Sequence, residues 1–222
     1  MFAGTLSRAE APSLTLQEQE QGWKLLFNGE DLAGWSSFKK KDGPEKGWVV
    51  ENGALKHVAK GGGGDIISDA EFGDFELTWE WMVALGANSG LKYFISEERK
   101  QAIGHEYQLI DDARHPDAKL AQGKRVTASF YDVLAPKDRK THEAGEWNTS
   151  RVLVKGNHVE HWLNGGKVLE YELGSPELEE AVSKSKFKTE KGFGTKIKGH
   201  ILLQDHGDEI TFRKIKIREH GN

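Results

Sequence analysis

Apolar and polar residues alternate along several short stretches of the chain, most regularly over Phe75–Val83. The apolar side chains that share one face of this stretch are Phe75, Leu77, Trp79, Trp81 and Val83. A period of two residues is that of a β-strand with one face packed in the core. The pattern therefore predicts a central core strand.

The stretch Gly104–Asp112 also alternates, but its second face is polar. Tyr107 and Leu109 share one face, which suits packing, whereas Glu106 and Gln108 share the other. A carboxylate beside an amide has no comparable packing role. Either this face is open to water, where such residues are ordinary, or it lines a functional site; we favour the site because of the motifs described below.

Turn signals divide the rest of the chain into further short strands. Asn52-Gly53 between two apolar stretches predicts a tight hairpin over 48–57, because Asn-Gly readily adopts positive φ. Further strands are expected over 91–95, 126–133, 151–155, 158–163, 168–173, 200–205 and 210–218, and a helix over 176–183 behind the N-cap Ser175. In the strand over 91–95, Leu91, Tyr93 and Ile95 are expected on one face and Lys92 and Phe94 on the other. Many short strands with one helix predict an all-β, two-sheet antiparallel sandwich.

Length and charge narrow the class of protein. The 222 residues suit an N-terminal flexible arm over 1–21 and a single β-sandwich domain over 22–222. A net charge of -4 without a basic block argues against a nucleic-acid partner, and the lysines at 184–198 are interpreted as a solvated loop. With no cysteine, disulfides and Cys-ligated zinc are excluded. No apolar run is long enough for a membrane span, and the polar residues 1–21 indicate a mature or trimmed chain.

Six motifs in order resemble those of the 3-keto-disaccharide hydrolase domain family. They are Gly22–Trp35, Asn88-Ser89-Gly90, Glu106–Asp112, Gly145–Asn148, Trp162–Gly165 and Leu203–Gly207 with Phe212-Arg213. The resemblance runs from about Gly22 to Arg218 and implies a jelly-roll sandwich similar to concanavalin A-like lectins and glucanases. It also implies hydrolysis of 3-keto-glycosides, a periplasmic, cell-surface or secreted location, and a separate sugar 3-oxidoreductase that supplies the substrate. Many relatives have an arginine shortly after Asn-Ser-Gly; here Lys92 is the candidate cation.

The implied substrate sets the chemistry that the site must supply. A ketone at C3 acidifies the hydrogen at C2, so a base can remove it, the aglycone at C1 can leave by β-elimination, and water can add to the enone. This route needs a base, stabilisation of the enolate and an acid for the leaving oxygen. Two alternatives stay open, namely a non-catalytic carbohydrate-binding module on the same fold and an ordinary glycoside hydrolase with a carboxylate pair.

Glu106 is the leading candidate for the base, and His206, whose imidazole titrates near neutral pH, is the second catalytic candidate. The structural alternatives are an ion pair of Glu106 with Lys92 and a histidine bonded within a turn. The candidate substrate-binding residues are Asn88, Lys92, Gln108, Asp111, Tyr131, Trp147, Gln204 and Arg213. Among these, Tyr131 and Trp147 are proposed as stacking platforms for sugar, and Arg213 as a partner of Glu106 or Asp111.

Metal binding stays open at this point. The chain has nine histidines but no His-x-His pair and no His-Glu-x-x-His motif. Asp111, Asp112 and His115 could together ligate a divalent ion. His158 and Glu160, on one strand face with Trp162, are interpreted as a surface ladder. No cofactor is assigned.

Overall fold

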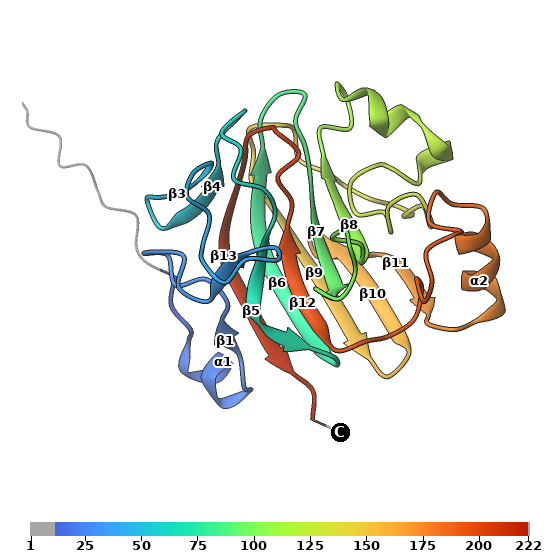
Figure 1. The fold of residues 1–222 in the computed structure, drawn as a ribbon, viewed down its shortest axis with the longest axis horizontal. Helices are drawn as coiled ribbons and strands as arrows, with labels where there is room; N and C mark the ends of the chain where they lie inside the picture. The colour runs from blue at the N-terminus through green and yellow to red at the C-terminus, as the bar shows by residue number, and fades with distance from the viewer. Residues whose placement is uncertain (1–11, 222) are drawn as a thin grey trace, which may run out of the picture.

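Two antiparallel sheets face each other in a computed structural model, which describes residues 12–221 (Figure 1). The larger sheet has the order β11 (Gly166–Glu172), β10 (His158–Leu163), β9 (Asn148–Lys155), β6 (Phe75–Val83), β13 (Ile210–Glu219), β4 (Ala54–His57) and β3 (Trp48–Glu51), and β1 (Lys24–Leu25) pairs with β13. The smaller sheet has the order β2 (Trp35–Ser37), β5 (Ile66–Phe72), β12 (Gly199–Leu203), β7 (Asn88–Ile95) and β8 (His105–Ile110). The helices are α1 (Leu16–Glu20), α2 (Pro176–Ser183) and the 3-10 turns η1 (Pro116–Lys119) and η2 (Ala121–Gly123). The predicted all-β sandwich is confirmed.

The core lies between the sheets and is built from the apolar faces that alternation predicted. The five apolar residues on the inner face of β6 are all buried, and the ring of Trp79 meets Tyr107 of β8 edge-on at 5.0 Å between centroids. The hydroxyl of Tyr107 donates to Trp162 O at 3.0 Å and accepts from Ser150 Oγ at 2.9 Å. Because its one polar group is satisfied, Tyr107 can be fully buried without a desolvation penalty.

Local signals placed the first hairpin and the long helix correctly. Strands β3 and β4 are joined by Asn52 and Gly53 at φ 51° and 73°, the positive values that a type I′ turn needs. Helix α2 begins after Ser175, whose Oγ accepts from Leu178 N at 3.2 Å. Both elements depend on neighbouring residues alone, so the sequence suffices to predict them.

The strand expected over 126–133 does not form. Ala128 and Asp132 adopt φ of 67° and 64°, so the segment folds into turns, and only Phe130 makes isolated bridges, to Tyr107 and Leu134. The segment still lies along the free edge of β8, because Ala128 N donates to Gln108 O at 2.9 Å and Tyr131 N donates to Glu106 O at 3.0 Å. It therefore covers that edge without extending the sheet.

The expected faces of β7 are correct only as far as Tyr93. Phe94 has φ 59°, which reverses the alternation, so Phe94 joins the main core and Ile95 packs on the other side with Ile67 and Leu202. The paired strand β12 shifts register at the same level, between His200 and Leu202. A bulge of this kind re-aims side chains and has no signature in the polar pattern.

The N-terminal arm predicted over 1–21 contains a helix. Thr15 and Glu18 form a capping box that begins α1, and Trp23 N donates to Glu18 O at 3.0 Å. Residues 1–11 lie outside the described residues. No helix within the described residues is both long and apolar enough to cross a membrane.

Candidate active site

A cavity of about 490 Å³ opens over the face of the smaller sheet that points away from the core. Strands β7 and β8 supply its floor, and the segment after α2 closes one side. Seven of the residues proposed from the sequence line it: Asn88, Lys92, Glu106, Gln108, Tyr131, Gln204 and His206. Such a volume is in the range of small-molecule sites, and amide and charged side chains suit a ligand rich in hydroxyl groups.

Glu106 lies on the cavity floor and is only 6% exposed, so the polar face of β8 is not a water-covered surface. Lys92 sits directly opposite it in the β7–β8 register, with Nζ 3.5 Å from Glu106 Oε2. Lys92 Nζ also donates to Ala102 O at 3.5 Å. The ion pair with Lys92, the structural alternative for Glu106, is therefore present, and Glu106 also lies at a cavity.

Two neighbours fix the position of the Glu106 carboxylate. Gly90 lies beside it, and a Cβ at that position would be 2.8 Å from Glu106 Oε1. The second neighbour is the Gln108 amide. With its nitrogen turned toward Glu106, the amide donates to Glu106 Oε1 at 3.1 Å and to Ser89 O at 2.8 Å. The Asn-Ser-Gly motif thus supplies both room and a hydrogen-bond acceptor beside the proposed base.

His206 stands at the rim, with its side chain 45% exposed. Its Nε2 lies 3.4 Å from Asn88 Nδ2, and its Nδ1 lies 3.9 Å from Asp208 Oδ2. Asp208 Oδ2 also accepts a hydrogen bond from Asn88 N at 2.9 Å. An accessible imidazole with a carboxylate behind it is suited to exchanging protons with a ligand.

The cavity also contains charged residues that sequence reasoning missed. Asp65 follows the four-glycine loop, and burial raises the pKa of its carboxyl; the nearby Asp205 and Glu106 act in the same direction, and Lys92 opposes them. A carboxyl that keeps its proton more easily could act as an acid. Nothing in the local sequence marks Asp65, because only strand pairing brings the start of β5 near β8.

Lys186 is the second missed residue, since the lysines at 184–198 were interpreted as a solvated loop. Lys186 lines the cavity, and its Nζ lies 4.1 Å from the centroid of the Tyr131 ring. Burial lowers the pKa of its ammonium group. Lys186 is thus an exposed residue of the predicted loop whose side chain also lines the cavity.

Asp111 lies outside the cavity and holds a loop together. Its carboxylate accepts from Gly86 N at 2.8 Å and from Ala113 N at 3.1 Å, and it pairs with Arg114 at 3.2 Å. Hydrogen bonds from Gly86 and Arg114 lower the pKa of Asp111 despite the opposing effect of burial. These contacts match the turn-cap alternative for this residue.

Trp147 and Arg213 also lie away from the cavity, and they contact each other. The Arg213 guanidinium stacks 3.8 Å from the Trp147 ring centroid, and its Nε donates to Glu80 Oε2 at 2.6 Å. The expected pairing of Arg213 with Glu106 or Asp111 is therefore wrong. The reason is topological, since Arg213 belongs to β13 in the larger sheet, whereas Glu106 belongs to the smaller one.

Asp111, Asp112 and His115, which the sequence left open as possible ligands of a divalent ion, do not form a candidate metal group among residues 12–221. Asp111 pairs with Arg114, and Asp112 pairs with Arg139 and accepts from Thr127 N at 2.9 Å.

Another group at the cavity rim has ligand types suited to a divalent ion: His115, His206 and Asp208 offer atoms within 4.8 Å of one another. Nδ1 of His115 accepts from Asp117 N at 3.2 Å, so metal binding there would require that ring to release this contact or to use Nε2.

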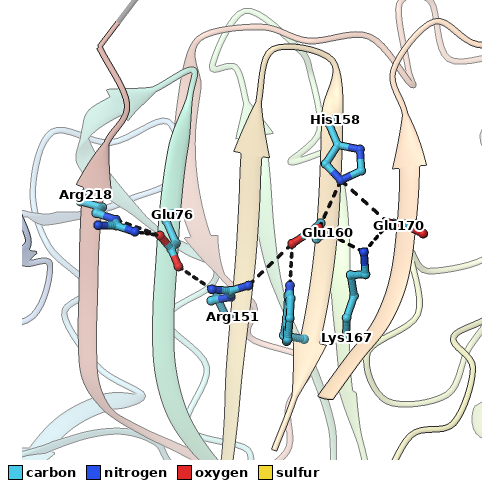
Figure 2. Close-up of polar contacts among 8 residues, drawn as sticks. Glu76, Arg151, His158, Glu160, Lys167, Glu170 and Arg218 are labelled. Atoms are coloured by element: carbon cyan, nitrogen blue, oxygen red, sulfur yellow. Dashed lines mark hydrogen bonds and ion pairs between the residues drawn. The ribbon is translucent and has the colours of Figure 1, made fainter. Parts of the chain in front are cut away.

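A second group, His158, Glu160 and Glu170, lies on the outer face of the larger sheet and forms a ladder of alternating charges (Figure 2). Glu160 accepts from Trp162 Nε1 at 2.7 Å and pairs with Lys167 at 3.3 Å and Arg151 at 3.6 Å. Since cations and donors already occupy its oxygens, this face is the surface ladder expected from the sequence.

Comparison with known proteins places this geometry in a family. A model of the 3-keto-alpha-glucoside-1,2-lyase-like domain matches residues 22–218. A curated Bacteroides thetaiotaomicron protein named 3-keto-disaccharide hydrolase is 34% identical over 247 residues, covering 98% of this chain and 85% of the relative.

Solved structures agree. A Parabacteroides distasonis protein that bears the name of a glycosyl hydrolase superposes with a TM-score of 0.87 at 32% identity, covering 96% of this chain and all of the other. A Bacillus subtilis protein with a galectin-like fold, at 14% identity and a TM-score of 0.50 over 89% of this chain and 94% of the other, shares the fold alone. The family predicted from the six motifs is confirmed: the chain belongs to the 3-keto-alpha-glucoside-1,2-lyase-like domain family.

Proposed function

We propose that this protein is a hydrolase of glycosides whose sugar carries a ketone at C3, with 3-keto-disaccharides as the substrate class. The observation that carries the proposal is the position of Glu106, a buried carboxylate that faces a polar cavity and is held there by Lys92 and Gly90. The name of the Bacteroides thetaiotaomicron relative supports the choice of substrate class.

The proposed reaction begins with transfer of the C2 proton to Glu106. The electron pair left at C2 moves onto the C3 oxygen as an enolate, then returns to expel the aglycone from C1 and form an enone. Water adds to the enone at C1, C2 regains a proton, and the sum is hydrolysis of the glycosidic bond. Because the C3 ketone acidifies C2–H, one carboxylate base can suffice where an ordinary glycosidase needs a carboxylate pair.

Two groups at the cavity could donate the proton to the leaving oxygen. His206 is accessible at the rim, and Asp65 has a raised pKa. His206 is the preferred donor, since an imidazole exchanges protons readily near neutral pH. Asn88, Gln108 and Gln204 would orient the sugar through its hydroxyl groups, with Tyr131 at the side of the cavity.

The substrate must come from a reaction that oxidises the C3 hydroxyl of a sugar, so the proposal includes a separate sugar 3-oxidoreductase that acts first. It also places the protein in the periplasm, at the cell surface or outside the cell, as the family resemblance implies. Fractionation of the source cells with an antibody to this chain tests the location.

The decisive experiment incubates the purified protein with a 3-keto-disaccharide and with the unoxidised parent, each with and without EDTA, and follows the released sugars. Turnover of the keto form alone is expected. Cleavage of the parent would indicate an ordinary glycosidase, whereas binding without turnover would indicate a carbohydrate-binding module. Loss of activity in EDTA, restored by a divalent ion, would show that a metal is required and would make His115, His206 and Asp208 its candidate ligands at the cavity rim.

Glu106→Gln tests the base, because it keeps the shape of the side chain and removes its basicity. We expect it to bind the keto sugar while turnover falls at least 100-fold, consistent with the usual contribution of a positioned base. Glu160→Gln is the matched control, since Glu160 is a half-buried carboxylate of the ladder in Figure 2 and lies on the other sheet. Equal losses in both variants would contradict the assignment.

A further inference from the structure

Two lysines line the cavity, and they differ in their partners. Lys92 Nζ is 3.5 Å from the Glu106 carboxylate, which neutralises much of its charge. Lys186 Nζ makes no hydrogen bond and has no carboxylate within 4.0 Å among residues 12–221. It lies over two aromatic rings, 4.1 Å from the centroid of Tyr131 and 5.0 Å from that of Phe187. Within the described cavity, Lys186 is therefore the cation whose N–H groups remain available to a ligand.

The position of Lys186 is fixed, although the chain around it has no regular secondary structure. Its backbone N donates to Asp132 Oδ2 at 2.6 Å, and the same carboxylate accepts from Arg125 Nε at 2.6 Å. The next residue, Phe187, is buried and stacks on Phe193 with 4.3 Å between centroids. These anchors on both sides hold the lysine at the cavity wall.

Tyr131, which lies under the ammonium group, is also held. Its hydroxyl donates to Asp117 Oδ2 at 2.7 Å, and its backbone N donates to Glu106 O at 3.0 Å. The ring thus connects the Lys186 ammonium to the residue proposed as the base. A cation over an aromatic face is held in place without losing its charge to a counter-ion.

We propose that Lys186 is a catalytic residue that binds the oxygen on C3 of the sugar and stabilises the negative charge that develops there as Glu106 removes the C2 proton. This inference rests on the proposed function. The bonds that change are those already described; Lys186 forms no covalent bond, and its N–H groups donate to the enolate oxygen. A preorganised donor at a developing oxyanion commonly contributes a factor of about 10²–10³ to kcat.

The lowered pKa of Lys186 supports this role. Partial desolvation at the cavity wall lowers the pKa of the Lys186 ammonium group, which favours sharing of its proton with an enolate oxygen. Lys92 is less suited, because its ammonium group is already paired with the Glu106 carboxylate before the reaction.

The test compares Lys186→Met, Lys186→Arg and Lys188→Met on a 3-keto-disaccharide. Lys188, an exposed residue of the same segment that is not part of the cavity lining, provides the matched control. We expect Lys186→Met to lower kcat about 100-fold or more with a small change in KM, Lys186→Arg to recover at least a tenth of the wild-type rate, and Lys188→Met to stay within twofold. Equal melting temperatures exclude a folding defect.

Deuterium uptake at C2 of a bound 3-keto sugar, followed by NMR in D₂O, measures proton removal directly and should slow in Lys186→Met by the same factor. A merely structural role would leave this exchange unchanged. Near-normal turnover by Lys186→Met, or a Lys186 adduct trapped with cyanoborohydride, would overturn the inference while leaving the proposed function standing. If the wild-type protein turns over no keto sugar, the function fails first and the inference falls with it.

Discussion

Gly90 provides the space that the Glu106 carboxylate occupies. The two residues lie on adjacent strands, and a Cβ at Gly90 would be 2.8 Å from Glu106 Oε1 and 3.0 Å from both Cδ and Cγ. A side chain at position 90 would therefore collide with the Glu106 carboxylate. The glycine of the Asn-Ser-Gly motif is therefore explained by contact with a side chain rather than by an unusual backbone conformation.

Gly90→Ala should displace the Glu106 carboxylate and lower kcat at least tenfold, with a loss of about 1–3 kcal/mol in the free energy of unfolding from overpacking. Steady-state kinetics and urea unfolding measure the two effects. Gly73→Ala is the control, because nothing lies within 4 Å of a Cβ at Gly73. Unchanged kcat in Gly90→Ala would show that the carboxylate position is not critical.

Removing Lys92 should destabilise the protein more than replacing the whole ion pair. Lys92→Met leaves the Glu106 carboxylate buried without its cation, so we expect a loss of about 3 kcal/mol. The double variant Lys92→Met with Glu106→Gln should recover much of that loss, since a neutral amide tolerates the same place. A double-mutant cycle by urea unfolding measures this coupling, and additive effects would argue against it.

Stability should fall as the pH drops below about 6.5, because two buried histidines lose their proton more easily in the folded state. Burial lowers the pKa of His105 to about 3 and that of His161 to about 4. The unfolded chain then binds more protons than the folded one, so each histidine removes up to about 1.4 kcal/mol of unfolding free energy per pH unit between 6.5 and its folded pKa.

Urea unfolding at several values between pH 7.5 and 4.5 measures that slope, and His105→Gln should reduce it by the share of one histidine.

His158 affects the unfolding free energy in the opposite direction. A hydrogen bond to Glu172 raises the pKa of His158, so its contribution to stability is present below pH 6.5 and is lost as the pH rises through the raised value. Solvent screening makes that effect small, and His158→Gln should hardly change the acid slope. An identical slope in His105→Gln and the wild type would contradict the assignment.

Arg213→Gln should change stability but not substrate recognition. It removes the stack on Trp147 and the bond to Glu80, which together support the larger sheet, while the cavity lies on the smaller one. We expect KM and kcat within twofold of the wild type and an unfolding free energy lower by about 1 kcal/mol. A tenfold rise in KM would return Arg213 to the substrate site.

Much of the site was visible in local patterns. The alternation of β8 separates Glu106 and Gln108 from Tyr107 and Leu109, and the structure keeps that separation. Lys92, the candidate cation that follows Asn-Ser-Gly, lines the same cavity. The faces of these side chains were predictable because successive residues of a regular strand point to opposite sides of the sheet.

Other parts of the site were not predictable in this way. Trp147 and Arg213 have side chains suited to a sugar site, but side-chain type does not say which sheet a strand joins. Asp65 and Lys186 sit beside unremarkable glycines and lysines in the sequence. They reach the cavity only because β5 pairs into the smaller sheet and Phe187 anchors the segment after α2 in the core.

The sequence by itself determined most of the strands, the hairpin, the capped helix and the two faces of β8, because each depends on residues a few positions apart. Only the tertiary structure decided which charges meet: Lys92 with Glu106, Arg213 with Glu80, and Lys186 with no carboxylate within 4.0 Å in the described chain. Such pairings depend on the order of strands in each sheet and on bulges such as the one at Phe94. Those features minimise the free energy of the whole core, and no short stretch of sequence contains that information.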